Sequence, residues 1–190
     1  FTFSNVTLYE GTLVKFKYTV DETDVDQKFI IPSSNADTST LKVIVQNSAS
    51  DTSSNTYTLS SGFSGVGSDS KVYFIQESTD GKFEVYFGDG VTGKKLENGN
   101  VVILEYIVTN KTSSNGAKTF ALQGSVGGFT NVSITTNSVS QGGADSEDNE
   151  SVKFNAPLNF AAQDRAVTTT DYETLVKGIY PNALSVSAWG

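Results

Sequence analysis

The chain has 190 residues, of which 37% are hydrophobic and 11% aromatic, enough for a sizeable core that folds without disulfides. The absence of Cys and His excludes thiolate metal sites, Cys nucleophiles and the commonest general base. Its 13 Lys and Arg against 21 Asp and Glu give a net charge of -8, the wrong sign for a protein whose main partner is nucleic acid.

The ends and the hydropathy of the chain lead to two further expectations. No apolar run approaches the roughly 20 residues that span a bilayer, so we expect no membrane insertion. The sequence has no Met, even at position 1, so we expect it to be an excised piece of a longer protein.

Strands are predicted first, because apolar and polar residues alternate along the first two thirds of the chain. The alternation is clear at residues 14–20, VKFKYTV, and at residues 41–46, LKVIVQ. Two polar stretches, residues 33–40 and 46–56, are rich in Ser, Thr, Asn and Asp. Such side chains hydrogen-bond to the nearby backbone, so these stretches predict turns.

A hairpin and another strand come next in the predicted order. Residues 72–77 and 82–87 flank Asp80 and Gly81, a pair typical of tight hairpin turns. The run NVVILEYIVTN, residues 100–110, is rich in β-branched residues and predicts a strand.

The pattern becomes helical from about residue 141. Pro157 is expected to break or restart the first helix near Asn155. A cluster of acids favours a helix start just before it, because free backbone N–H groups attract negative charge. These acids are Asp145, Glu147, Asp148 and Glu150.

A second helix is predicted from Thr170, which has capping-box spacing to Glu173. Gly178 and Pro181 are expected to end it. The last residues alternate again, and ALSVSAW, residues 183–189, predicts a closing strand.

These elements together predict an α+β fold that is mainly β. We expect an antiparallel β domain over residues 1–140. A smaller α+β segment with two short helices should follow it over residues 141–190.

The stretch FGDGVTGKK, residues 87–95, raises the question of a nucleotide site, because Gly88 to Lys95 match the spacing of a phosphate-binding loop. Lys95 stands where that loop needs a Ser or Thr, and no helix of useful length fits between Lys95 and Val101. We therefore predict a structural turn between two strands. Its shaping residues are Gly88, Asp89, Gly90 and Gly93.

The acidic clusters could in principle hold calcium, but neither has the order of a calcium-binding loop. The cluster at 145–150 is better explained as a solvated helix start, and a second one as an exposed loop. The second cluster consists of Asp21, Glu22, Asp24 and Asp26. The sequence thus predicts no catalytic residue, no metal ligand and no cofactor.

Two segments resemble a known family. YFGDGVTGKKLENGNVVILEY, residues 86–106, resembles a segment of baseplate wedge subunits from T4-like contractile-tailed bacteriophages, and residues 142–190 resemble a later segment of the same subunits. The second segment is also similar to the broader baseplate J-like family, in which an Arg-Ala-Val-Thr, here Arg165 to Thr168, precedes a capped Asp-Tyr-Glu helix, here from Asp171. Residues 1–75 match no family that we can place.

The resemblance implies a non-enzymatic structural role in the phage virion. Subunits of this family associate with copies of themselves and with other baseplate wedge proteins, and they rearrange when the sheath contracts. The baseplate would be assembled in the host cytoplasm. The positions at which we expect contacts are Lys94, Lys95, Arg165, Asp171 and Tyr172.

Two other functions remain open at this point. One is a phage-tail carbohydrate or receptor-binding β module, which an aromatic row on a sheet face would favour. The other is an enzyme, either a nucleotidase that uses Gly88 to Lys95 or a glycosidase that uses paired carboxylates.

Overall fold

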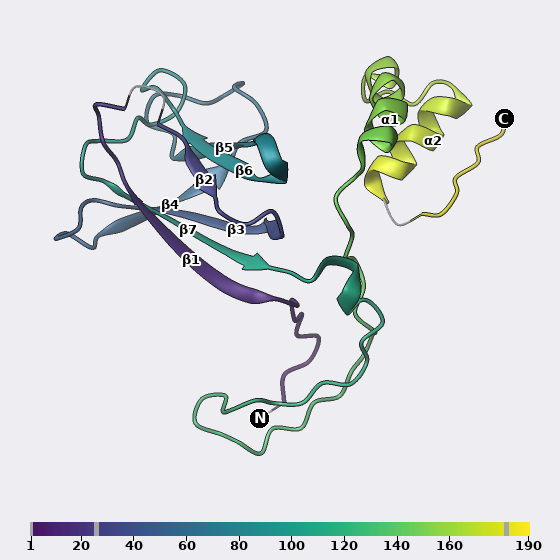
Figure 1. The fold of residues 1–190 in the computed structure, drawn as a ribbon, viewed down its shortest axis with the longest axis horizontal. Helices are drawn as coiled ribbons and strands as arrows, with labels where there is room; N and C mark the ends of the chain where they lie inside the picture. The colour runs from purple at the N-terminus through teal and green to yellow at the C-terminus, as the bar shows by residue number, and fades with distance from the viewer. Residues whose placement is uncertain (1, 25–26, 181–182) are drawn as a thin grey trace. The chain divides into compact units, whose positions relative to one another are not determined.

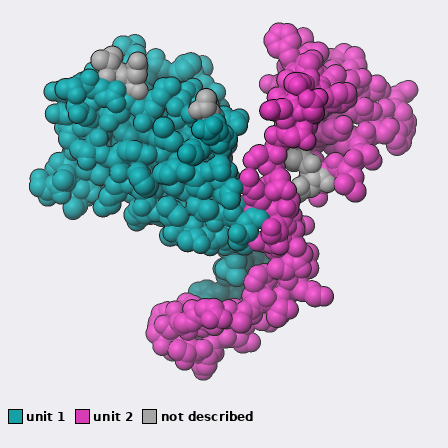
Figure 2. Space-filling view, in the orientation of Figure 1, with its two compact units in different colours: residues 1–110 teal, residues 111–190 magenta. Residues whose placement is uncertain are grey.

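A computed structural model describes residues 2–24, 27–180 and 183–190 of the chain (Figure 1). The chain divides into two compact units, residues 1–110 and residues 111–190 (Figure 2). The predicted domain division at residues 140 and 141 stays a prediction, because compactness alone does not show which segments fold independently.

Seven strands of unit 1 form one sheet in the order β1-β7-β3-β4-β5-β6-β2 within the described residues (Figure 1). Neighbouring strands pair antiparallel, as predicted, except that β4 and β5 run parallel. The prediction of a purely antiparallel domain is therefore wrong in this one pairing, and the sheet is mixed. The strands are β1 Thr12–Thr19, β2 Phe29–Ile31, β3 Ala36–Gln46, β4 Ser54–Leu59, β5 Val72–Glu77, β6 Phe83–Phe87 and β7 Val101–Val108.

The two outermost strands of the sheet, β1 and β2, approach each other through side chains. The Tyr18 hydroxyl on β1 donates to the Ile30 carbonyl on β2 at 2.6 Å. The rings of Tyr18 and Phe29 meet edge to face with centroids 5.6 Å apart. The sheet therefore curls until its edges meet, and side-chain contacts join them.

The core of unit 1 lies inside this curled sheet. Along β7, Val102, Leu104 and Tyr106 are almost fully buried, and they alternate with residues on the other face. Burying one such side chain stabilises the fold by about 1.5–3 kcal/mol. The other strands except β1 supply Phe29, Ile31, Val43, Val45, Tyr57, Tyr73 and Val85 to the same cluster, and Val20, just after β1, completes it.

The predicted hairpin and the predicted strand at 100–110 are confirmed. β5 and β6 pair antiparallel, with Tyr73 opposite Phe87 and Glu77 opposite Phe83. Asp80 and Gly81 between them both have positive φ, 67° and 64°. Asp and Gly tolerate this conformation better than most residues, which explains why the pair makes the turn.

Other strands contradict the prediction of turns in polar stretches. Residues 36–40 belong to β3, and residues 54–56 belong to β4. β2, with only three residues, was not predicted at all. These segments are strands because they pair with other strands: residues 36–37 with β7, residues 54–56 with the preceding strand β3, and β2 with β6. Such pairing overrides local preference. A register shift between Asp37 and Lys42 retains the irregularity that the polar residues favour.

Unit 2 contains the helices α1, Asn149–Ala162, and α2, Thr169–Ile179, with a short 3₁₀ turn at Lys111–Ser114. Asp148 caps α1 by accepting from the Ser151 N–H at 2.7 Å, which confirms the acidic helix start. The predicted break at Pro157 is wrong, because α1 continues through it. Pro157 and Lys153 are exposed, so water can bind the Lys153 carbonyl that loses its helical donor.

The cap of α2 lies two residues earlier than predicted. Thr168 and Asp171 form the capping box, in which the Thr168 hydroxyl accepts from the Asp171 N–H at 3.2 Å. The prediction of Thr170 and Glu173 is therefore wrong, although both pairs have the same spacing. Asp171 has a shorter side chain than Glu173, and its carboxylate also accepts from the Val167 N–H. Pro181, expected to end the helix, lies outside the described residues.

The predicted closing strand is also wrong, because residues 183–189 form no strand. A strand needs a neighbour, and the described part of unit 2 offers none. Glu173 instead accepts from the Ala188 N–H at 3.0 Å. Among the described residues, neither helix is long and apolar enough to cross a bilayer.

Candidate functional site

The turn after β6 is the feature that the sequence singled out, and its backbone is closely bonded. The Gly90 N–H donates to the Gly93 carbonyl at 3.0 Å. The Gly93 N–H donates to the Gly67 carbonyl at 3.1 Å, and the Lys94 N–H donates to the Ser70 carbonyl at 2.8 Å. The turn is therefore tied to the segment that leads into β5.

Two of its glycines are required by close backbone contacts. A Cβ added to Gly88 would overlap the carbonyl group of Gly93, because the two groups would lie closer than Cβ contacts in real structures. Gly93 is buried and has a φ of +90°, a conformation that L side chains rarely adopt. The turn thus needs glycine at these positions for steric reasons.

Asp89 occupies the place where a phosphate loop would bind its ligand. Its Oδ1 accepts from the backbone N–H groups of Val91 at 2.9 Å and Thr92 at 2.8 Å. In a phosphate loop, the turn's backbone N–H groups point at the phosphates and a helix follows. Here residues 96–100, all of them described, form no helix. The nucleotide interpretation therefore lacks both parts of its geometry.

The carboxylate of Asp89 is held in its charged form. The N–H of Thr92 is the largest cause that lowers its pKa, followed by the N–H of Val91, and the positive charge of Lys95 adds to the effect. The turn consequently presents an exposed negative charge at neutral pH.

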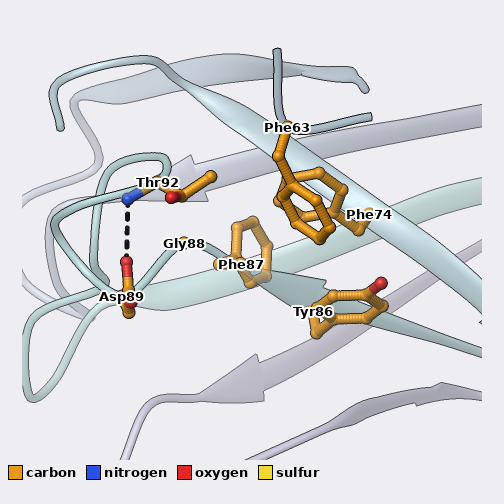
Figure 3. Close-up of a pocket in the computed structure, with 7 residues that line it drawn as sticks. All are labelled: Phe63, Phe74, Tyr86, Phe87, Gly88, Asp89 and Thr92. Carbon is orange, nitrogen blue, oxygen red and sulfur yellow. Dashed lines mark hydrogen bonds between the residues drawn. The ribbon is translucent and has the colours of Figure 1, made fainter. Parts of the chain in front are cut away.

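A shallow hollow of about 400 Å³ lies beside this turn (Figure 3). In the view of Figure 3, Asp89 and Thr92 lie on one side of it and the Tyr86 ring on the other. Its lining residues are Phe63, Phe74, Tyr86, Phe87, Gly88, Asp89 and Thr92.

Three of the rings form a row on the outer face of β5 and β6. Phe74 and Tyr86 are opposite each other in the ladder and stack with centroids 5.3 Å apart and planes 21° apart. Phe63 comes from the segment between β4 and β5, and its ring centroid lies 5.1 Å from that of Phe74. Phe74 is only 5% exposed, whereas Phe63 is 65% exposed. The middle ring of the row is therefore buried, and the Phe63 end is exposed to solvent.

The sequence did not predict this row, because Phe63 joins it from a loop that no strand pattern covers. The Phe74 and Tyr86 pair could have been found from the predicted hairpin, since its register places them opposite each other.

The five residues of the predicted contact surface are divided between the two units. Lys94 and Lys95 belong to the turn of unit 1, with Lys95 exposed. Arg165 lies in the connection between α1 and α2, and Asp171 and Tyr172 lie in the first turn of α2. The Thr168 N–H is the largest cause that lowers the pKa of Asp171, and the positive charge of Arg165 adds to this effect. Tyr172 is 51% exposed.

The acidic clusters are used in local hydrogen bonds. Asp21 accepts from the hydroxyl and the backbone N–H of Thr23. Asp26 lies outside the described residues. Glu147 accepts from Ser151 and Asn155. Among the described residues, no three acidic side chains come together as a metal ion would require.

Comparison with known proteins gives the class of the molecule. The family model described as the third domain of the bacteriophage baseplate wedge protein gp6 matches residues 14–119, so the chain belongs to this family of T4-like baseplate wedge subunits. The match runs from β1 to residues beyond β7 and includes the turn after β6, so the statement that residues 1–75 match no family is wrong for residues 14–75.

A particular relative agrees with the family match. The baseplate wedge protein gp6 of Enterobacteria phage T4 is 31% identical over 133 residues, which cover 58% of this chain and 20% of that protein. The chain thus spans about a fifth of the length of this curated relative.

Proposed function

We propose that this chain is a non-enzymatic structural component of a baseplate wedge in the phage tail. In this proposal it associates with copies of itself and with neighbouring wedge proteins, and it rearranges when the sheath contracts. Assembly takes place in the host cytoplasm, and the finished protein resides in the virion baseplate.

The observation that carries the proposal is the family match over residues 14–119. It covers the curled sheet except for the first two residues of β1, Thr12 and Leu13, and this sheet is the part of the chain with a closed core. A sheet with a closed core and largely exposed loops suits a building block that contacts other proteins.

The surface of unit 2 supports a role in association. Its helices and following segment expose many large apolar side chains, although single exposed apolar residues are common on monomers. The exposed set includes Phe154, Phe160, Val167, Tyr172, Ile179, Tyr180, Leu184 and Trp189. Contacts with neighbouring chains would remove this area from water.

The charges on the turn and on the helix connection support the choice of contact positions. Lys95 is exposed beside Asp89, and Arg165 lies near Asp171. Exposed charges of both signs direct which partner surfaces can approach. We therefore retain Lys94, Lys95, Arg165, Asp171 and Tyr172 as the proposed contact residues.

A capture experiment tests the proposal. The 190-residue chain is immobilised, dissociated baseplate wedges of a T4-like phage are passed over it, and retained proteins are identified by mass spectrometry. We expect retention of wedge proteins that survives moderate salt. Replacing Arg165 and Tyr172 together by Ala should reduce retention, whereas Lys82→Ala, at a lysine outside the proposed contact residues, should not.

Failure to retain any wedge protein would contradict the proposed association. Self-association is measured separately, by sedimentation velocity of the chain over a range of concentrations. A strictly monomeric chain at every concentration would remove self-association from the proposal.

A further inference from the structure

We infer that the hollow beside the turn after β6 receives an arginine side chain from a neighbouring protein. The inference deepens the proposed function and rests on it only for the source of the arginine, a neighbouring wedge protein. The binding itself follows from the lining of the hollow.

The aromatic row supplies the first attraction. The π-face of an aromatic ring is negative, and it attracts a cation placed over it. Phe63 is largely exposed, and Tyr86 is half-buried on the far side of the buried Phe74. A flat guanidinium can stack against such rings while its N–H groups stay free to bond.

Asp89 supplies the second attraction, at the edge of the same hollow. Its carboxylate is charged at neutral pH and is oriented by the N–H groups of Val91 and Thr92. A carboxylate and a guanidinium form short, charge-assisted hydrogen bonds. The orientation exists before any partner arrives, so little freedom is lost on binding.

The lining favours a cation over other ligands. None of the lining residues in the described part of the chain is basic, and the negative charge of Asp89 repels anions. An aromatic row on a sheet face also favours a sugar, but a sugar offers hydroxyl groups that need several donors and acceptors, and the polar side chains of the lining are only Tyr86, Asp89 and Thr92. An arginine satisfies the rings and the carboxylate together.

Lys95 competes with the incoming arginine for the same carboxylate. It is exposed, and its positive charge acts on Asp89. Removing this lysine should therefore strengthen binding. A merely structural role for the turn gives no reason for such a gain.

The test uses the intact 190-residue chain and two probes, acetyl-Gly-Arg-Gly-amide and acetyl-Gly-Lys-Gly-amide, titrated by NMR. We expect saturable shifts of the Val91 and Thr92 amide signals and of the Tyr86 ring signals with the arginine peptide. The lysine peptide should bind more weakly, because an ammonium lacks the planar face that stacks.

Variants locate the binding. Asp89→Asn retains an oxygen that can accept from Val91 and Thr92, so the turn should persist while affinity falls about threefold to fivefold. Phe63→Ala should reduce affinity about twofold to fivefold. Lys95→Ala should raise affinity. Asp51→Asn is the matched control, because Asp51 also accepts from a nearby backbone N–H, that of Ser53, in a different loop.

Three results would overturn the inference: no saturable shift with the arginine peptide, equal binding by Asp89→Asn, or shifts caused by methyl β-glucopyranoside and not by the peptide. Its failure can be told apart from failure of the proposed function. Wedge proteins retained without any peptide binding would contradict only the arginine site, whereas peptide binding without retention would contradict only the wedge assembly.

Discussion

The two compact units of the chain differ in how far they bury their apolar side chains. All of the buried hydrophobic residues identified in the described part of the chain belong to unit 1, except Ala162. In unit 2, the helices α1 and α2 pack together but leave most of their large apolar side chains exposed. The sheet is therefore stabilised from within, whereas the stability of the helical unit should depend more on contacts that cover it.

The largest expected effect compares a core position with an exposed one. Leu104→Ala, at a fully buried position of β7, should lower the free energy of unfolding of unit 1 by about 2–5 kcal/mol, because it leaves a cavity. Phe154→Ala, at a position 66% exposed on α1, should change the free energy of unfolding of unit 2 by less than about 0.5 kcal/mol. Urea unfolding followed by circular dichroism measures both.

Equal losses in the two variants would break the comparison. They would show that Phe154 is buried in the isolated chain in solution, for example by self-association. Repeating the Phe154→Ala measurement at several protein concentrations separates these causes, because only association depends on concentration.

The next effect concerns the turn of unit 1. Gly88→Ala should destabilise the fold by about 1–3 kcal/mol, because the added methyl group would overlap the carbonyl group of Gly93. Gly62→Ala is the matched control, since a methyl group added there would meet nothing within 4 Å and its φ is not positive. Its effect should be neutral or slightly stabilising. Equal melting temperatures for the two variants would contradict this account of the turn.

The third effect concerns unit 2 and the cap of α2. Thr168→Ala should destabilise α2 by about 1 kcal/mol, because the Asp171 N–H loses its acceptor. Thr170→Ala should cost less, since the Thr170 side chain does not cap the helix in this structure. Hydrogen exchange of the first-turn amides of α2 measures the difference. Greater loss of protection in Thr170→Ala would favour the cap position predicted from sequence.

How much the sequence predicted also differs between the units. The β5–β6 hairpin and β7 were predicted because their alternation and the Asp80-Gly81 turn are local signals. β2 was not predicted, because it is a strand only through its pairing with β6, which is distant in sequence. β4 and its parallel pairing with β5 were missed because the polar residues 46–56 locally favour turns, although β4 pairs with the preceding strand β3. Local preference does not contain that information.

In unit 2 the error at the cap of α2 came from competition between equivalent local signals. Both Thr168 with Asp171 and Thr170 with Glu173 have capping-box spacing, and only the folded backbone selects the first. The same limit applies to the candidate site. The turn at Gly88 was visible from its glycines, but the ring of Phe63 reaches Phe74 only through a loop whose path the sequence does not specify.

The smallest effect tests whether charge contributes to the stability of the sheet. Lys15 on β1 bonds to Glu105 on β7 at 2.7 Å, and this hydrogen bond is the largest cause that lowers the pKa of Glu105. A lowered folded-state pKa means that the stabilisation is complete above the ordinary Glu pKa of about 4.3 and is lost as the pH falls through the lower folded value. Because the pair is partly exposed, the contribution should be at most about 1 kcal/mol.

Glu105→Gln should therefore flatten the pH dependence of urea unfolding below about pH 4.3 and leave the variant slightly less stable at neutral pH. An unchanged acid dependence in Glu105→Gln would assign that dependence to other carboxylates, of which the closest alternative is Glu84, whose pKa is lowered by its bonds to Gln76 and Lys28.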